Sequence, residues 1–415
     1  MSAFPATVPG FLARYAALRD ALPGDPAARD AAAAALRELG LPGTAGGRRA
    51  EAWKYTSLRA LTEAPLADLA STITKELPAP LAPARLVVID GRFHPELSTL
   101  PPAARVTGFA AAPAFDPAAG ADGSVLAALN TVFAADGVGI SVPAGIDGGV
   151  VELLSLTTSG QAAHPRHAVT LGAGARLTLI ETIAGAGRAL HNPLTVIRLE
   201  PGAVLTHPRL QTEAEEAFHL ARIVAVLGAD AVWRGFTLTA GAALSRTEIH
   251  ATLAGPGAMA EASAALLLSG TRHADLATVI RHEAPGGSSR QRVRSVLTGA
   301  SRGVFQGRIE VARAAQKTDG YQMSQALLLS EAAEMDVKPE LEIFADDVKC
   351  SHGATLGALD PDQVFYLRAR GIPAAAARAM LVRAFLDDQL DAVPHDAARA
   401  AMEAAVALWW DQHGA

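Results

Sequence analysis

A short segment that opens on Gly-Ala or Pro-Gly and continues into alternating apolar residues recurs along the middle of this chain. It reads "GAGARLTL" near residue 172, "PGAVLTH" near 201, "GADAVWRGFTL" near 228, "GAALSRTEI" near 241 and "GAMAEASAALLL" near 257. The intervals are roughly 27 to 29 residues or about half of that, which is typical of the successive turns of a solenoid. The pattern predicts a mainly β protein whose core, residues 85–345, is a right-handed parallel β-helix.

The first part of the chain, residues 1–84, predicts a helical domain followed by a linker. Asp25 before Pro26 is typical of a helix N-terminus, and Gly40 is typical of the end of the same helix. "RRAEAWKYTSLRAL", residues 48–61, predicts a short helix or an ordered turn. "LPAPLAPA", residues 77–84, contains too much proline for regular structure and is expected to connect the two domains.

The last part, residues 346–415, predicts helices again. Asp360 and Pro361 begin a helix, and Gly371 ends it before a second helix starts. Four apolar residues share one face of the second helix: Val382, Phe385, Leu386 and Leu390. This face must be buried against the first helix, the solenoid or another chain. The tandem tryptophans in "ALWWDQ" predict either an anchor for a partner or packing on the neighbouring helix.

The net charge and the cysteine content limit which binding partners and which cellular compartment are expected. The formal net charge is -6, and no block of like charges occurs. We therefore expect no nucleic-acid partner and no binding to an anionic membrane. A single cysteine fits a reducing compartment, and the sequence shows neither a signal peptide nor an apolar run long enough to span a bilayer. The expected location is the cytoplasm.

Common catalytic motifs are missing from the sequence. It contains no "GxxxxGK[ST]", "GxSxG", "HExxH" or "CxxC" pattern. His164 and His167 in "HPRH" have a spacing that could ligate a metal, but a surface turn explains them equally well. A β-helix lyase or hydrolase is an alternative, and it needs paired carboxylates. Asp346 and Asp347 are adjacent, so on a strand they would face opposite ways. The two cannot form the acid-base pair of such an enzyme, and any catalysis would need residues outside these motifs.

The only cysteine lies two residues before a histidine in "DDVKCSHGATLG". The alternating residues that precede it predict a strand, on which Cys350 and His352 point to the same face and Ser351 points away. Thiolate and imidazole are ligands for iron or zinc, but two side chains leave a metal site incomplete. Cys350 is therefore either an inert buried residue or part of a site that another polypeptide completes. Gly353 permits a close backbone approach, which favours the second interpretation.

Residues 304–372 resemble the SufB/SufD family of the Suf iron-sulfur cluster assembly system. The resemblance rests on "KPELEIFADDVKCSHGAT" and, near the N-terminus, on "EAWKYTSLRAL". The "CSHGAT" motif, and the absence of the additional cysteine with which SufB accepts sulfur, make the chain more similar to the SufD branch than to SufB.

The resemblance implies a scaffold or assembly subunit of a SufB-SufC-SufD complex that is not itself an enzyme. SufB is expected to bind the β-helix core, and the ATPase SufC the C-terminal helices. His352, and more weakly Cys350, would contribute to a transient iron-sulfur cluster or iron site shared with SufB, and the isolated chain would bind no cofactor stably. A homodimer that acts without SufB is a further alternative, because paralogues that share a sheet edge can also pair with themselves.

Overall fold

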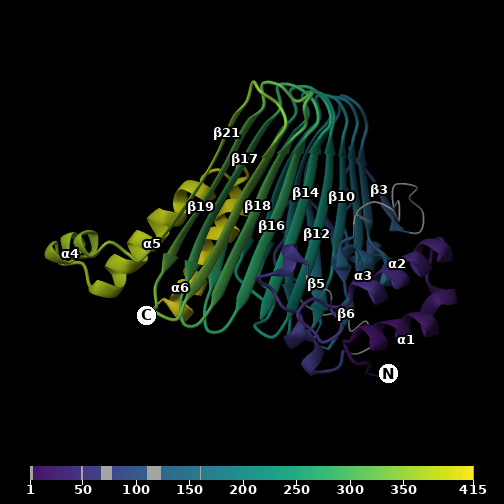
Figure 1. The fold of residues 1–415 in the computed structure, drawn as a ribbon, viewed down its shortest axis with the longest axis horizontal. Coiled ribbons are helices and arrows are strands. Elements are labelled where there is room, and N and C mark those ends of the chain that lie inside the picture. Colours follow the sequence, from purple (N-terminus) through teal and green to yellow (C-terminus); the bar gives the residue numbers. More distant parts are fainter. Residues whose placement is uncertain (1–2, 48–49, 67–76, 110–122, 159, 415) are drawn as a thin grey trace.

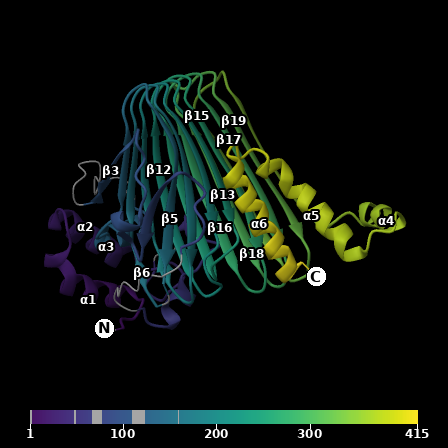
Figure 2. The same ribbon diagram turned by 180° about the vertical axis from the view of Figure 1, so that it is seen from behind.

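Two parallel β-sheets wind together into one long solenoid, with helices at both ends of the chain (Figures 1 and 2). The computed structural model describes residues 3–47, 50–66, 77–109, 123–158 and 160–414. The chain alternates between the two sheets along most of the solenoid, so each turn contributes one strand to either sheet. The predicted mainly β architecture, a parallel β-helix with helical ends, is confirmed.

The first sheet has ten strands within the described residues. In spatial order they are β2 (Arg92–Phe93), β1 (Ala84–Ile89), β5 (Asp147–Thr157), β8 (Arg176–Gly185), β11 (Val204–Gln211), β13 (Val232–Thr239), β15 (Met259–Leu268), β17 (Ser288–Leu297), β19 (Asp319–Leu328) and β21 (Lys349–Gly357). All neighbours are parallel except the short β1-β2 pair. The sheet therefore ends on β21.

The second sheet has eleven strands in the same described ranges. Its main path is β20 (Glu334–Ile343), β18 (Arg302–Val311), β16 (His273–His282), β14 (Leu244–Leu253), β12 (Phe218–Leu227), β10 (Leu194–Leu199), β7 (Arg166–Leu171), β4 (Val138–Val142) and β3 (Arg105–Gly108). Two short strands, β6 (Ala162–Ala163) and β9 (Leu190–His191), continue this sheet beside β12. This sheet ends on β20.

The strand register accounts for the repeat in the sequence. Val204 pairs with Val232, which lies 28 residues later. Gly174 and Gly202 lie at equivalent turns with φ of +67° and +69°, a conformation that glycine adopts without strain. The Gly202 amide donates to the carbonyl of Ala229 one turn later, at 2.8 Å. Each Gly-containing element is thus a corner that stacks on the next corner, while alternate apolar residues fill the interior.

The N-terminal helices cover the outer face of the second sheet. They are α1 (Val8–Leu18), α2 (Pro26–Leu39) and α3 (Val125–Phe133), with short 3₁₀ turns η1 (Arg19–Ala21), η2 (Glu51–Trp53), η3 (Arg59–Glu63) and η4 (Pro95–Leu97). Asp25 caps α2 by accepting from the Ala27 amide at 2.9 Å, and Gly40 ends the helix with φ +68°, both as expected. The "EAWKYTSLRAL" segment forms the ordered turns η2 and η3. The apolar side chains meet Leu190, Phe218 and Leu244.

Helix α3 was not predicted, because the sequence showed no helical stripe between residues 85 and 300. The segment "VLAALNTVF" is mostly apolar, and its two polar residues, Asn130 and Thr131, are themselves buried, so it has no solvent-facing polar side that would mark a surface helix. The structure explains this composition, since all nine residues of the helix are buried. A helix enclosed by other elements on every side has no need for a polar face.

The C-terminal helices are α4 (Pro361–Ala369), α5 (Ala374–Leu390) and α6 (Asp396–His413). The apolar face of α5 packs with α6 on the outside of the first sheet, against Phe236 and Leu267 among others. Of the alternatives left open by the sequence, the solenoid is therefore the partner of this face. Trp409 is buried in the same cluster, while Trp410 is half-buried. Helix α4 buries none of its residues and extends away from the solenoid (Figure 1).

Candidate functional site

The Cys-x-His pair lies on β21, the last strand of the first sheet. The strand begins four residues beyond residue 345, where the sequence-based boundary of the β-helix core was drawn, and it pairs with β19 in parallel. Cys350 is paired with Gly320 and His352 with Gln322. Within the described residues β21 has no neighbour on its other side. The motif therefore occupies an open edge at the end of the solenoid.

The two side chains share one face of the strand, as the sequence predicted. Gly320 and Gln322 are buried and alternate along β19 with partly exposed residues. Paired residues of parallel strands point to the same side. Cys350 and His352 thus face the direction of the solenoid interior, and Ser351 faces outward. Because no further turn covers them, His352 is exposed even though it continues an interior row.

Cys350 is held partly inside an apolar cluster. Its side chain packs against a group formed by Ile309, Val311, Ala315 and Ala345. A Cβ atom at Gly320 would lie only 3.3 Å from the Cys350 Sγ, so this glycine leaves room for the thiol. Burial raises the pKa of Cys350. The thiol is therefore protonated at neutral pH and is a poorer ligand than the exposed imidazole of His352.

The pair does not form a complete metal site within this chain. Across the described ranges, no group of three potential His, Cys, Asp or Glu ligands includes Cys350 or His352. Asp346 and Asp347 lie in the exposed bend between β20 and β21 and not on a strand. The missing side chain at Gly353 makes room for a residue of the same chain, since a Cβ atom there would lie 2.9 Å from the Met323 Cε.

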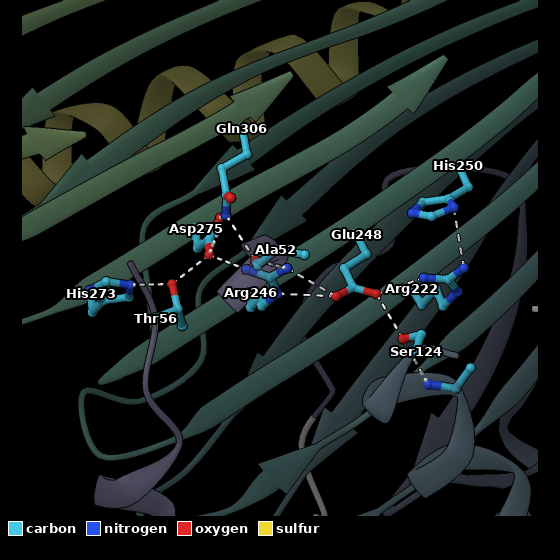
Figure 3. Close-up of polar contacts among 11 residues, drawn as sticks. Ala52, Thr56, Ser124, Arg222, Arg246, Glu248, His250, His273, Asp275 and Gln306 are labelled. Atoms are coloured by element: carbon cyan, nitrogen blue, oxygen red, sulfur yellow. Dashed lines mark hydrogen bonds and ion pairs between the residues drawn. The ribbon is translucent and has the colours of Figure 1, made fainter. Parts of the chain in front are cut away.

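The "EAWKYT" element joins the N-terminal segment to the second sheet (Figure 3). The Arg246 guanidinium lies 3.9 Å from the centre of the Trp53 ring and donates to the Ala52 carbonyl at 2.9 Å. The Thr56 hydroxyl donates to Asp275, which also pairs with Arg246. This motif therefore anchors the N-terminal segment to β14 and β16 and lies away from β21.

Buried ionic contacts extend this junction toward α3. Glu248 accepts from Arg246 at 3.1 Å and from Arg222 at 2.6 Å. The Ser124 hydroxyl, at the N-terminus of α3, donates to the same carboxylate at 2.8 Å. One carboxylate thus links a strand pair of the solenoid to the helix that the sequence did not reveal.

The two histidines of "HPRH" are buried structural residues. His164 Nδ1 contacts Asn192 Oδ1 at 3.0 Å, and its ring stacks on Phe133. The Val138 amide donates to His167 Nδ1 at 3.2 Å. Neither residue belongs to a three-ligand group in the described part of the chain. Neither lies on a surface turn, because both side chains are buried.

Comparison with known proteins identifies the family. Residues 154–385 match the family described as "SUF system FeS cluster assembly, SufBD core domain". The Escherichia coli iron-sulfur cluster assembly protein SufD is 33% identical over 373 residues, which cover 86% of either chain. A SufBD family protein of Synechocystis is 31% identical over 398 residues, covering 88% of this chain and 87% of the relative.

This chain belongs to the SufBD family. Its role therefore lies in iron-sulfur cluster assembly, together with other proteins of the Suf system. The matched region includes the solenoid from β5 onward and the motif strand β21. None of the helices in the described ranges combines the length and the apolar character that a bilayer span requires.

Proposed function

We propose that this SufBD protein is a SufD-like assembly subunit that completes a transient iron-sulfur site together with a SufB-like paralogue. The observation that carries the proposal is the position of His352, an exposed imidazole on the last, open strand of the solenoid. It contributes one ligand to a cluster or iron shared with the paralogue. Cys350 contributes more weakly, and the subunit has no catalytic activity of its own.

The end of the solenoid has the properties of a docking surface for another β-helix. Leu356 on β21 pairs with Ala326, a buried core residue, yet Leu356 is 52% exposed. Ile343 on β20 pairs with Val311, which is fully buried, yet Ile343 is 38% exposed. These side chains face the interior direction but lack a following turn. Exposed edges with apolar residues favour pairing with another strand edge.

The C-terminal helices offer a second surface, which we assign to the ATPase SufC. Helix α4 presents Phe365 and Tyr366 to solvent. A groove between α5 and α6 is lined by Met380, Arg383 and Trp410. Because α5 and α6 are fixed on the first sheet, a movement of a bound ATPase would be transmitted to the solenoid.

Blocking the open end tests the proposed pairing. Leu356→Lys, co-expressed with the paralogue and the ATPase, places a charge at the end of the solenoid and is expected to prevent pairing with the paralogue. Val226→Lys is the matched control, because Val226 is an exposed apolar residue on β12 in the middle of the solenoid. Gel filtration of the co-purified proteins measures how much of the paralogue remains bound to each variant. Equal recovery of the paralogue with both variants would place the interface elsewhere.

The same variant addresses the homodimer. If the isolated chain pairs with itself through the same edge, gel filtration of the wild type alone yields a dimer that Leu356→Lys converts to a monomer. A dimer that survives Leu356→Lys uses another surface.

The carbohydrate-active alternative has no support from Asp346 and Asp347, since the two lie in a bend beside the edge strands.

A further inference from the structure

The interior of the solenoid contains ionisable side chains in addition to its apolar core. Leu205 on β11 and Ile223 on β12 belong to the apolar core. Because side chains alternate along a strand, every second residue from these two also points into the solenoid, as do the residues paired with them on neighbouring strands. Five of them are charged or imidazole groups: Glu181, His191, His207, Arg209 and His219. All five are buried. Such groups are costly inside a protein unless each has a partner.

Two of these histidines converge on one carboxylate. His191 Nδ1 lies 2.9 Å from Glu213 Oε1, and His219 Nδ1 lies 2.9 Å from Glu213 Oε2. His191 and His219 are paired on the adjacent strands β9 and β12, with ring centres 5.3 Å apart. The three ligand atoms all lie within 4.8 Å of one another. Each of the three residues is at most 3% exposed.

The contact between His219 and the carboxylate is less well aligned than that of His191. Its buried Nδ1 lies 2.9 Å from Glu213 Oε2, but the angle does not meet hydrogen-bond geometry. His191 Nδ1, at the same distance, does make a hydrogen bond. A buried nitrogen that faces a carboxylate without an aligned hydrogen bond requires an explanation, and a bound ion is one.

The surrounding residues hold the Glu213 carboxylate in place. Gln211 Nε2 donates to Glu213 Oε2 at 2.8 Å. The Ala242 amide donates to the Glu213 carbonyl at 3.0 Å. Gly241 allows this approach, since a Cβ there would lie 2.3 Å from that carbonyl oxygen. The carboxylate is therefore oriented by contacts that do not depend on the two histidines.

We infer that His191, Glu213 and His219 bind one divalent first-row transition metal ion, such as Fe²⁺ or Zn²⁺, inside the solenoid. Two imidazoles and one carboxylate form the ligand set that proteins use for non-haem Fe²⁺ and for Zn²⁺ with open positions. Ligand atoms around one such ion are about 3.3 Å apart, given metal-ligand bonds near 2.0 Å. Only small side-chain movements are therefore needed.

This site is separate from the one proposed at the end of the solenoid. β12 and β20 are four strand spacings apart, about 19 Å. The inference does not rest on the proposed function, and it departs from the sequence-based expectation that the isolated chain binds no cofactor stably. In the sequence the three residues show no ligand motif.

Metal titration of the untagged full-length chain tests the inference. The protein is stripped with a chelator and titrated anaerobically with Co²⁺ as the spectroscopic probe, and in separate samples with Fe²⁺ and Zn²⁺. The titration is repeated in a Cys350→Ser/His352→Ala background, so that ligands at the solenoid end do not contribute. We expect one bound ion per chain in both proteins, and imidazole scattering in the X-ray absorption spectrum of the Zn²⁺ form.

Substitutions identify the ligands. Glu213→Gln and His219→Ala are expected to weaken metal binding by more than the roughly 100-fold that loss of an outer partner can cost. Gln211→Met removes such a partner and is expected to weaken binding by about 10–100-fold. His282→Gln is the control, because His282 is a buried histidine bonded to Ser289, outside the cluster. It should bind metal like the wild type.

Three results would overturn the inference. They are no saturable binding by the wild type, no imidazole signal in its X-ray absorption spectrum, and unchanged affinity in a folded Glu213→Gln or His219→Ala variant. The first two measurements use the wild type alone, so they decide the matter even if the substituted chains do not fold.

Discussion

Cys350 and His352 share one face of the last strand, but the first is half-buried in an apolar cluster and the second is exposed. This difference makes His352 the stronger candidate metal ligand and Cys350 the weaker one. An imidazole at the open end can reach a metal held between two proteins without any rearrangement. The thiol would first have to leave its contacts with the core and lose its proton, which burial opposes.

We therefore expect His352→Ala to lower the iron-sulfur content of the co-expressed complex several-fold without dissociating it. One exposed side chain contributes little to an interface formed by two strand edges. Cys350→Ser should have a smaller effect, because the thiol is not the favoured ligand and serine nearly preserves its volume. Iron and sulfide analysis, with gel filtration to verify assembly, provides the measurement. A loss confined to Cys350→Ser would reverse the ranking.

The isolated chain is expected to form no iron-sulfur cluster after anaerobic reconstitution with iron and sulfide. Within the described residues Cys350 and His352 have no third ligand, and iron in clusters is usually held by several thiolates. The measurement is sulfide-dependent visible absorbance, compared with that of the co-expressed complex. A stable stoichiometric cluster on the isolated chain would contradict the shared site, whereas a single bound metal ion without sulfide would not.

The solenoid could be predicted from the sequence because its corners recur, and Gly174 and Gly202 occupy equivalent corners. The common face of Cys350 and His352 followed from strand alternation alone. The His191-Glu213-His219 cluster could not be predicted without the register, since Glu213 lies in a loop after β11. One signal was present, because His191 and His219 are 28 residues apart, which is the spacing of one turn. The junction at Trp53 depends on contacts with residues almost 200 positions away.

Arg246→Ala is expected to destabilise the chain by about 3–5 kcal/mol, because in a buried junction it removes the ion-pair partner of Asp275 and leaves Glu248 with Arg222. It also removes the contact that holds Trp53. Urea unfolding monitored by tryptophan fluorescence measures the change. Arg281→Ala is the matched control: its pair with Glu310 is partly exposed, and we expect a change within about 1 kcal/mol. Similar losses for both variants would contradict the assigned role of the junction.

Stability is expected to fall as the pH decreases from 6.5 toward 4. Burial lowers the pKa of His164 to about 3 and that of His167 to about 4, while the unfolded chain takes up protons near 6.5. In this window the unfolded state binds more protons, so each histidine lowers the free energy of unfolding by about 1.4 kcal/mol per pH unit. The stabilisation is fully present above 6.5.

His167→Asn tests the origin of this slope. Asparagine retains an acceptor for the Val138 amide but does not titrate. We expect the dependence of the unfolding free energy on pH between 6.5 and 4.5 to become shallower by about one proton. Comparison at pH 8, where both side chains are neutral, isolates the packing cost of the substitution. An unchanged slope would mean that His167 does not cause the pH dependence.

Helix α4 is expected to be a main contact for the ATPase. Phe365 and Tyr366 are 71% and 56% exposed, and neither packs on the solenoid. Exposed aromatic residues on a projecting helix are typical anchors for a partner. Replacing both with alanine should weaken ATPase binding by at least about 2 kcal/mol. Because neither side chain is buried, the stability of the chain should change by less than about 0.5 kcal/mol.

This substitution is a sharper test than removal of the C-terminal helices. Truncation would also expose the apolar face of the first sheet that Val382 and Leu386 cover, so a loss of binding could reflect unfolding. Leu100→Ala is the control, because Leu100 is also 56% exposed but lies near the N-terminal end of the solenoid. Calorimetric titration with the ATPase, alongside urea unfolding of each variant, separates binding from stability. Undiminished affinity in the double alanine variant would move the contact to the groove between α5 and α6.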